Sequence, residues 1–459
     1  MSSDRNIYLY WVGKEYKLIS ILRDLIYLHS TNGVGYKVNL ITDKNIREYV
    51  KDIPDYFSSL CPAHQADFVR VHVICDYGGI WLDSDTIVVD KLDSLFDIIE
   101  KKNGFFMKEN NLYLVNGVFG SKKQTDLMIK WKTQLMNVLN SKQGKNIGWS
   151  DVGSSILKKI YDSHVNVYDN YEIFNGLDNM YPVYYPKCVN EFIEKPYDNY
   201  KNIVREYQPL VVLVNSVYKK LENKTEKEIL EGNMPINYFI NKSFENNRKI
   251  IYLKIAKNAG TMMTHVFKNS KYESVESYFV EDWNRKRFYT SKIITLAHEL
   301  NISSFKKTYS KIFDYANKLI IFRNPLERVV SGYNYLKYNK GYPYYLNKIN
   351  RTVKKCEKQN YDKDYIHFDI LQLDSIDYNK TTYHTELYKF IDMFCLEKIN
   401  KLFCELNLDI RISNLNKNAS NTYCFPDEDS INLIKMKYKS DINFYENAFN
   451  YADKKICKL

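Results

Sequence analysis

The sequence predicts an α/β protein with two domains, and three observations lead to this class. The chain has 459 residues, which is more than one compact core ordinarily holds. Short apolar strands alternate with amphipathic helices at the start of the chain. The same alternation starts again near residue 249, after a polar stretch. This rhythm is typical of sheets flanked by helices, so each half is expected to fold around its own sheet.

The first half is expected to open with a strand, a helix and a strand. Apolar residues follow a strand period, then a helical period, then a strand period at residues 7–12, 14–29 and 37–42. Apolar runs at residues 104–107 and 209–214 indicate further strands.

A second helix and strand in this half lead to a pair of aspartates. Pro62 suits the first turn of a helix that ends at residue 77, where two glycines stop it. A short strand at residues 80–82 comes next, and Asp83 and Asp85 follow it directly. Ligands of α/β proteins bind where strands end, so this edge is a candidate site.

The domain boundary is expected in a polar, helical stretch rich in Lys and Asn. We therefore divide the chain into a domain at 1–225, a linker at 226–247 and a domain at 248–459. The second domain starts with a strand at 249–255, a small-residue loop and a helix at 261–267. A strand at 318–322 feeds a helix from Pro325, and the last hundred residues are expected to be mostly helical.

Composition excludes several classes of protein. With 45% hydrophobic and 26% charged residues the chain is globular, and its net charge of +11 is spread without a block of like charges. No nucleic-acid-binding motif is present, and the eight cysteines lack zinc spacing. No signal peptide and no run of 18 apolar residues is found. We expect a cytosolic protein with no stable membrane insertion.

Asp83 and Asp85 have the chemistry of a metal site. Two carboxylates one residue apart at a strand end can bind one Mn²⁺ or Mg²⁺ that also binds a diphosphate. The cation would act as a Lewis acid on the leaving diphosphate. An Asp-x-Asp pair alone is a weak signal, but here Asp67 and Arg70 lie one helical turn apart on the preceding helix. A simple i,i+3 ion pair is the alternative reading of those two residues.

The run AHQADFVRVHVICDYGGIWLDSDTIVV at residues 63–89 resembles the DXD-containing glycosyltransferases with a GT-A, Rossmann-like fold, including enzymes of capsular-polysaccharide synthesis. The resemblance implies a UDP- or GDP-sugar donor and a glycan acceptor. It implies acceptor-side loops at residues 116–120 and 151–153. The implied donor-binding residues are Asp67, Arg70, Gly79, Asp83 and Asp85, with Asp83 and Asp85 as metal ligands.

One feature departs from this family. Relatives often carry a His near the end of the domain as a further metal or phosphate contact, whereas residues 211–216 read VVLVNS. An alternative is therefore that only the second half is active and that the first half is a glycan-binding module.

The second half contains an anion-binding pattern. A strand, a loop of small residues and a helix N-terminus expose backbone N–H groups to a bound anion. The loop at residues 257–261 reads KNAGT, and its lysine precedes the glycine, so it is not a Walker A loop. This loop resembles the 5′-phosphosulfate loop of carbohydrate sulfotransferases, which use 3′-phosphoadenosine 5′-phosphosulfate (PAPS).

The later run RNPLERVVSGY at residues 323–333 resembles the 3′-phosphate site of the same enzymes, about 65 residues downstream. The resemblance implies a P-loop-like α/β sulfotransferase domain. Lys257 is the candidate for stabilising the leaving phosphate, and His298 or Glu299 for accepting the acceptor's proton; His265 is expected to pack. The implied PAPS-binding residues are Lys257, Asn258, Ala259, Gly260, Thr261, Arg323 and Ser331. The whole chain is thus expected to be a bifunctional enzyme that adds a sugar and sulfates a sugar hydroxyl.

Overall fold

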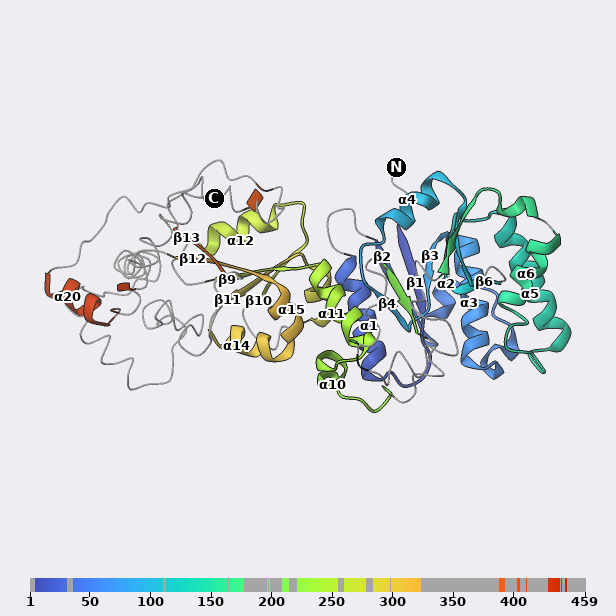
Figure 1. The fold of residues 1–459 in the computed structure, drawn as a ribbon, viewed down its shortest axis with the longest axis horizontal. Coiled ribbons are helices and arrows are strands. Elements are labelled where there is room, and N and C mark those ends of the chain that lie inside the picture. Colours follow the sequence, from blue (N-terminus) through green and yellow to red (C-terminus); the bar gives the residue numbers. More distant parts are fainter. Residues whose placement is uncertain are drawn as a thin grey trace. The chain divides into compact units, whose positions relative to one another are not determined.

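The computed structural model of the protein divides into two compact units, Met1–Asn247 and Arg248–Leu459 (Figure 1). Each unit contains one main sheet with helices around it, so the expected α/β class with two parts is confirmed. The residues that the structure describes are 5–30, 36–109, 113–163, 165–176, 196, 198, 209–213, 221–254, 260–277, 284–297, 299–322, 388–392, 403–404, 410, 428–437, 439 and 442–443.

The first unit has a six-stranded sheet in the order β2-β1-β3-β6-β5-β7. The pairs β2-β1, β1-β3 and β5-β7 are parallel, whereas β6 runs antiparallel to both β3 and β5. Parallel β1 and β3 end at the same edge, as the sequence suggested. The strands are β1 Asn6–Tyr10, β2 Lys37–Ile41, β3 Gly79–Leu82, β5 Gly104–Glu109, β6 Tyr113–Ser121 and β7 Tyr171–Asn175.

Helices of this unit pack a large aromatic core against the sheet. Trp81, Phe106, Phe119 and Trp131 are fully buried in one cluster, and the Phe106 and Phe119 rings stack with centroids 5.3 Å apart. The helices are α1 Lys17–His29, α2 Ile46–Tyr49, α3 Pro62–Tyr77, α4 Asp93–Lys101, α5 Asp126–Lys142 and α6 Ser154–Ser163, with 3₁₀ turns η1 Asp55–Ser59 and η2 Val165–Tyr168.

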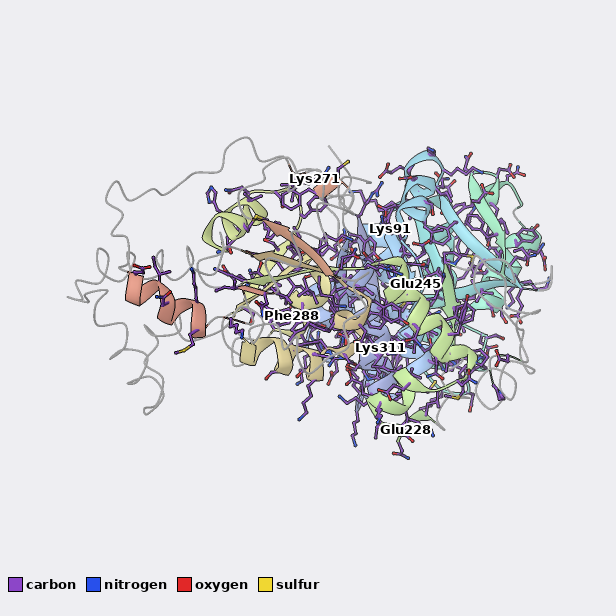
Figure 2. All side chains as sticks on the ribbon, turned by 60° about the vertical axis from the view of Figure 1, so that its left-hand side comes forward. Lys91, Glu228, Glu245, Lys271, Phe288 and Lys311 are labelled. Carbon is purple, nitrogen blue, oxygen red and sulfur yellow. The ribbon has the colours of Figure 1, made fainter. Side chains whose placement is uncertain are left out.

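The stretch that the sequence suggested as a linker forms two helices that belong to the first unit. Helix α10, Glu226–Glu231, begins with a capping box in which Thr225 and Glu228 exchange hydrogen bonds. Figure 2 labels Glu228 on this helix. From α11, Pro235–Asn246, Ser243 donates a 2.6 Å hydrogen bond to the carbonyl of Val88. Val88 ends β4, Thr86–Val88, which pairs antiparallel with β8, Leu210–Val212. The buried hydrogen bond from Ser243 fixes α11 to the first unit.

The second unit has a parallel sheet in the order β10-β11-β9-β12-β13. We expected mostly helix in the last hundred residues, but strand β13 lies there. It pairs with β12 at the edge of this sheet, and a partner so far away in the sequence leaves no local pattern. The strands are β9 Ile250–Lys254, β10 Ser274–Ser277, β11 Ile293–Ala297, β12 Asn317–Phe322 and β13 Tyr388–Asp392. The helices are α12 Gly260–Lys268, α13 Arg285–Thr290, α14 Glu299–Thr308, α15 Ser310–Tyr315 and α20 Glu428–Lys437.

Gly78 and Gly79 turn the chain from α3 into β3. Gly78 ends the helix with φ +72°, and Gly79 has φ +113°, conformations that favour glycine. A Cβ on Gly79 would lie 2.5 Å from the carbonyl oxygen of Asn6 in β1. Close approach of two backbones therefore accounts for Gly79, and its suggested contact with a donor stays a prediction.

Gly79→Ala is expected to destabilise the first unit by about 2–4 kcal/mol, because a backbone clash adds to the cost of a positive φ. Gly13→Ala is the matched control. Gly13 has φ +90° and nothing within 4 Å of an added Cβ, so only the conformational cost of about 1–2 kcal/mol applies. Urea unfolding followed by tryptophan fluorescence measures the stability of both variants, since Trp11, Trp81, Trp131 and Trp149 are in the first unit. Equal losses in the two variants would contradict the clash.

Candidate functional site

The candidate site of the first unit lies at the edge where β1 and β3 end. The Ser84 hydroxyl donates a 2.8 Å hydrogen bond to the carbonyl of Tyr10 at the end of β1. The Asp83 backbone N–H donates a 2.8 Å bond to the carbonyl of Gly117 in β6. Three strands thus hold the Asp83 segment, and α3 supplies the charged groups that face it.

Arg70 of α3 is the centre of this charged cluster. Its side chain is only 6% exposed, and Nη2 lies 3.0 Å from Oδ1 of Asp83. Nε lies 3.5 Å from Oδ1 of Asp67, one turn earlier on the helix. Nη1 donates a 2.5 Å hydrogen bond to the carbonyl of Asn116 in β6. Arg70 therefore joins α3 to the Asp83 segment after β3 and to β6. The alternative reading, a simple i,i+3 ion pair with Asp67, does not include these two contacts.

Asp67 is buried beside Arg70 and keeps a polar partner. Its Oδ1 accepts a 2.7 Å hydrogen bond from the side-chain amide of Asn116. Burial raises the pKa of the Asp67 carboxyl to about 6, and the nearby Arg70 charge opposes that rise. Burial at this position therefore disfavours the charged form of the Asp67 carboxyl.

Asp83 is partly open to solvent, with 29% of its side chain exposed. Its Oδ1 accepts a 2.8 Å hydrogen bond from the indole N–H of Trp81, and the Arg70 guanidinium lies over the Trp81 ring at 5.2 Å. Burial raises the pKa of the Asp83 carboxyl, whereas Arg70 and Trp81 lower it. These partners orient one carboxylate oxygen and leave Oδ2 toward Gly117.

Two glycines allow the backbone to approach these carboxylates. A Cβ on Gly117 would lie 2.8 Å from Oδ2 of Asp83. A Cβ on Gly153 would lie 2.5 Å from the Asn116 amide nitrogen and 3.2 Å from Oδ1 of Asp67. Both glycines fall in the segments expected to be acceptor-side loops, and the structure brings these segments to the aspartates.

Asp85 lies in the turn between β3 and β4. Its carbonyl accepts a 3.0 Å hydrogen bond from the backbone N–H of Leu213. Tyr16 is close enough for the Asp85 charge to raise the pKa of its hydroxyl, an effect that adds to the larger one of burial. Asp85 thus lies near a half-buried phenol that sequence reasoning did not select.

Sequence reasoning placed Asn116 and Gly153 in acceptor-side loops and not against Asp67, and it gave Trp81 no role in the site. A glycine within a strand pattern often marks close backbone approach, so the Asn116-Gly117 pair carried a usable signal. The contact of Gly153 with Asp67 joins residues far apart in the chain, and no local pattern predicts it.

In the second unit, three strands end at one edge and lead into the suggested PAPS segments. Lys254 ends β9 and pairs with Ala297, which ends β11; the neighbouring strand β12 ends at Phe322. Gly260 and Thr261 start α12, and Glu299 starts α14. Six of the suggested residues lie outside the described part of the chain: Lys257, Asn258, Ala259, His298, Arg323 and Ser331.

Glu276 of β10 ties together the elements around the loop that follows β9. Its side chain is 8% exposed and lies 2.6 Å from Nζ of Lys254 and 3.4 Å from Nζ of Lys268. The Thr264 hydroxyl of α12 donates it a 3.1 Å hydrogen bond. His265, which we expected to pack, is exposed and shares a 2.9 Å hydrogen bond with Asn269.

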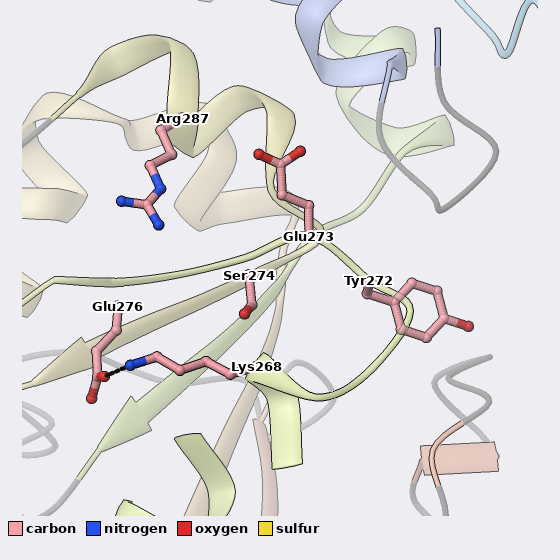
Figure 3. Close-up of a pocket in the computed structure, with 6 residues that line it drawn as sticks. All are labelled: Lys268, Tyr272, Glu273, Ser274, Glu276 and Arg287. Carbon is pink, nitrogen blue, oxygen red and sulfur yellow. Dashed lines mark ion pairs between the residues drawn. The ribbon is translucent and has the colours of Figure 1, made fainter. Parts of the chain in front are cut away.

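A hollow of about 520 Å³ lies where the chain enters β10 (Figure 3). It is found near the start of this parallel strand, whereas the suggested PAPS segments follow strand ends. Acidic and basic groups both face it, so it does not have the charge of a phosphate site. The lining residues are Lys268, Tyr272, Glu273, Ser274, Glu276 and Arg287.

Two family models match the chain, one in each half. Residues 1–188 match the family described as "Capsular polysaccharide synthesis protein". Residues 243–423 match the family described as "Sulfotransferase family". Both resemblances expected from the sequence are confirmed, and so is the expectation of an enzyme with a glycosyltransferase-like and a sulfotransferase region. No curated protein matches the chain.

Several solved glycosyltransferase structures show distant likeness. GlyE of Streptococcus pneumoniae TIGR4 is 12% identical, with a TM-score of 0.33, over 69% of this chain and 91% of its own. The PaToxG glycosyltransferase is 18% identical, with a TM-score of 0.25, over 52% and 86%. Galactosyltransferase LgtC is 10% identical, with a TM-score of 0.26, over 50% and 100%. At these TM-scores the assignment rests on the two family matches.

The family matches define a glycan-modifying enzyme in coarse terms. In general terms they imply a nucleotide-sugar donor for one region and PAPS for the other. Within the described part of the chain, no helix is both long and apolar enough to cross a bilayer.

The raised pKa of Asp67 predicts a pH dependence of stability. Because the folded pKa of about 6 exceeds the ordinary 3.8, the folded state holds a proton that the unfolded state releases between pH 4 and 6. Folding stability from this group is present below pH 4 and is lost as the pH rises through 6. As the pH rises from 4 to 7, the stability difference between Asp67→Asn and wild type should therefore shift in favour of the variant by up to about 3 kcal/mol.

Urea unfolding at several pH values, followed by tryptophan fluorescence, measures this difference. Asp162→Asn is the control, since Asp162 forms only an exposed i,i+4 pair with Lys158. A difference between Asp67→Asn and wild type that stays constant from pH 4 to 7 would argue against a raised pKa.

Proposed function

We propose that the chain is a bifunctional enzyme. Residues 1–225 transfer a sugar from a UDP- or GDP-sugar to a glycan, and residues 248–459 sulfate a sugar hydroxyl with PAPS. The observation that carries the first assignment is the buried Arg70 cluster, which holds Asp83 at a strand end in the region that matches the capsular family. Contacts from one helix and two strands hold Asp83 in place, as is expected for a residue of a binding site.

The residues present fit a divalent cation. Oδ1 of Asp83 is turned toward Trp81 and Arg70, and Oδ2 faces the space beside Gly117 that a Cβ would fill. Asp85 follows two residues later. Within the described residues no cluster of three or more acidic, His or Cys side chains could hold a metal. The remaining ligands would therefore be diphosphate oxygens and water, which suits Mn²⁺ or Mg²⁺.

A bound cation would neutralise charge on the leaving diphosphate. The protein's own part is to orient the donor. Arg70 keeps Asp83 in position, and Asp67 and Asn116 present a carboxyl and an amide at the same edge. We propose Asp67 as a contact for donor hydroxyls, braced by Arg70, with Gly79 allowing β3 to approach β1.

In the second unit we propose that the segments after β9, β11 and β12 form the PAPS site. The parallel topology brings the ends of these strands to one edge, and α12 offers its N-terminus there, with Gly260 and Thr261 in its first turn. Lys257 stabilises the leaving phosphate, and His298, with Glu299 as the alternative, takes the proton of the acceptor hydroxyl. Arg323 and Ser331 bind the 3′-phosphate, and Asn258 and Ala259 complete the loop.

A second candidate function is that only the sulfotransferase half is active. The observation that favours it is the segment at residues 211–216, which has no His where relatives often carry one. Titration of the full chain with UDP- and GDP-sugars and Mn²⁺ separates the two cases, since a glycan-binding module would bind no nucleotide.

Asp85→Asn is expected to abolish sugar transfer and donor hydrolysis and to leave sulfation unchanged, because it removes one carboxylate from the proposed metal site. EDTA should have the same effect. Radiolabelled sugar and sulfate transfer, measured on one sample, check both activities. Asp162→Asn is a matched exposed control. Sugar transfer that persists undiminished in EDTA would rule out the metal.

Lys257→Ala is expected to lower sulfation turnover most, because it removes charge stabilisation at the reacting end of PAPS. Arg323→Ala and Ser331→Ala should mainly weaken donor binding. For Arg323→Ala the loss in 3′-phosphoadenosine 5′-phosphate binding should be about 1.5–3 kcal/mol, the range of a charge-assisted hydrogen bond.

Calorimetric titration and steady-state kinetics check these variants, with exposed Lys227→Ala as the control. Binding that Arg323→Ala leaves unaffected would mean that the PAPS assignment is wrong.

A further inference from the structure

Trp149 is unusually open for a tryptophan. It is 72% exposed, in contrast to Trp81 and Trp131, which are fully buried in the core. Tryptophan is the largest apolar side chain, so leaving it in water forgoes much of the stabilisation that burial supplies. A single exposed apolar residue is ordinary in itself. The position of Trp149 is what distinguishes it.

The turn that presents Trp149 is held rigidly. The Asp151 carboxylate accepts hydrogen bonds from the backbone N–H of Gly148 at 2.8 Å and from Nζ of Lys142 at 2.7 Å. The Asp151 backbone N–H returns a 3.1 Å bond to the Gly148 carbonyl. Trp149 therefore stands on an ordered turn, and a ligand that stacks on it need not order the backbone first.

The same turn is anchored to the candidate donor site. Val152 is fully buried, and Gly153 fits against Asn116 and Asp67, where a Cβ would lie 2.5 and 3.2 Å from their side-chain atoms. Trp149 is four residues before Gly153. A chain spans at most about 3.6 Å per residue, so their Cα atoms are within about 14 Å. Trp149 thus stands on a turn whose end contacts the carboxylate cluster.

The chemistry of the turn suits a sugar ring. A pyranose presents an apolar face of C–H groups and a rim of hydroxyls, and aromatic surfaces next to polar groups bind such amphipathic ligands. Ser150 is adjacent, and its hydroxyl accepts a 2.7 Å hydrogen bond from Ser155. The charge of Lys142 is paired with Asp151 at 2.7 Å. Lys159 also lies near enough for its charge to act on Asp151. The indole face itself suits the apolar C–H face of a sugar ring better than a bare phosphate.

We propose that Trp149 is the platform on which a neutral sugar ring of the acceptor glycan stacks in the first unit. This inference rests on the proposed function, because it takes the Asp83 edge as the donor subsite. Under this inference Trp149 binds the acceptor and selects for an unsubstituted pyranose face.

The test is retention of the full-length chain on an array of neutral oligosaccharides, with UDP and Mn²⁺ in the buffer. Trp149→Ala should weaken retention of the bound oligosaccharides about tenfold, the loss expected for one stacking contact. Trp149→Phe should keep most of it, because a smaller aromatic face remains. Ile129→Ala is the control, since Ile129 is another exposed apolar residue of the same unit, on α5.

Equal retention of every arrayed oligosaccharide by wild type and Trp149→Ala would overturn the inference, and so would a wild type that retains no oligosaccharide. Glycans held by the sulfotransferase unit would be retained equally by all variants. Thermal shifts with UDP- and GDP-sugars and Mn²⁺ test the donor site separately. If these nucleotide sugars give no thermal shift, the proposed sugar transfer is wrong. The array still decides separately whether Trp149 binds a glycan.

Discussion

The first unit depends on one buried cation, the guanidinium of Arg70. Two carboxylates and a backbone carbonyl, from α3, β3 and β6, converge on it. A buried charge is costly unless it is paired and hydrogen-bonded, and removing one partner from such a group commonly costs 3–5 kcal/mol. Because the planar guanidinium has five N–H donors in fixed directions, it fixes the direction of Asp83 as well as its charge.

The second unit uses the opposite charge for a similar purpose. The Glu276 carboxylate joins β10 to Lys254 at the end of β9 and to Thr264 and Lys268 on α12. The strand and helix on either side of the suggested phosphosulfate loop are thus tied to one anchor. In both units a buried ion positions an element whose end faces the proposed ligand. If both units act on one glycan, a newly added sugar could be sulfated without a second enzyme.

Local sequence patterns predicted the elements that depend on interactions between residues close together in the sequence. The turn at Gly78 and Gly79, the helix that starts at Pro62 and the strand that leads to Asp83 all follow from short-range geometry. The Asp67–Arg70 pair was visible from its spacing, and the resemblance implied that both residues join Asp83 in one site. The contact with Asn116 was not predicted, because Arg70 and Asn116 are 46 positions apart. Ser243 and Val88 are separated by 155 positions, so the polar stretch around α11 gave no sign of its burial. Strand β13 was missed for the same reason, since its partner is β12.

The central claim is that Arg70 orients a metal-dependent donor site, and thermal unfolding of Arg70→Lys with nucleotide sugars tests it most directly. Lysine keeps the charge and loses the planar fork. Wild type should be stabilised by a UDP- or GDP-sugar only when Mn²⁺ is present, since a ligand that binds the folded state raises its stability. Arg70→Lys should unfold cooperatively and lose that metal-dependent shift. A shift of the same size in Arg70→Lys, or a wild-type shift without metal, would contradict the account.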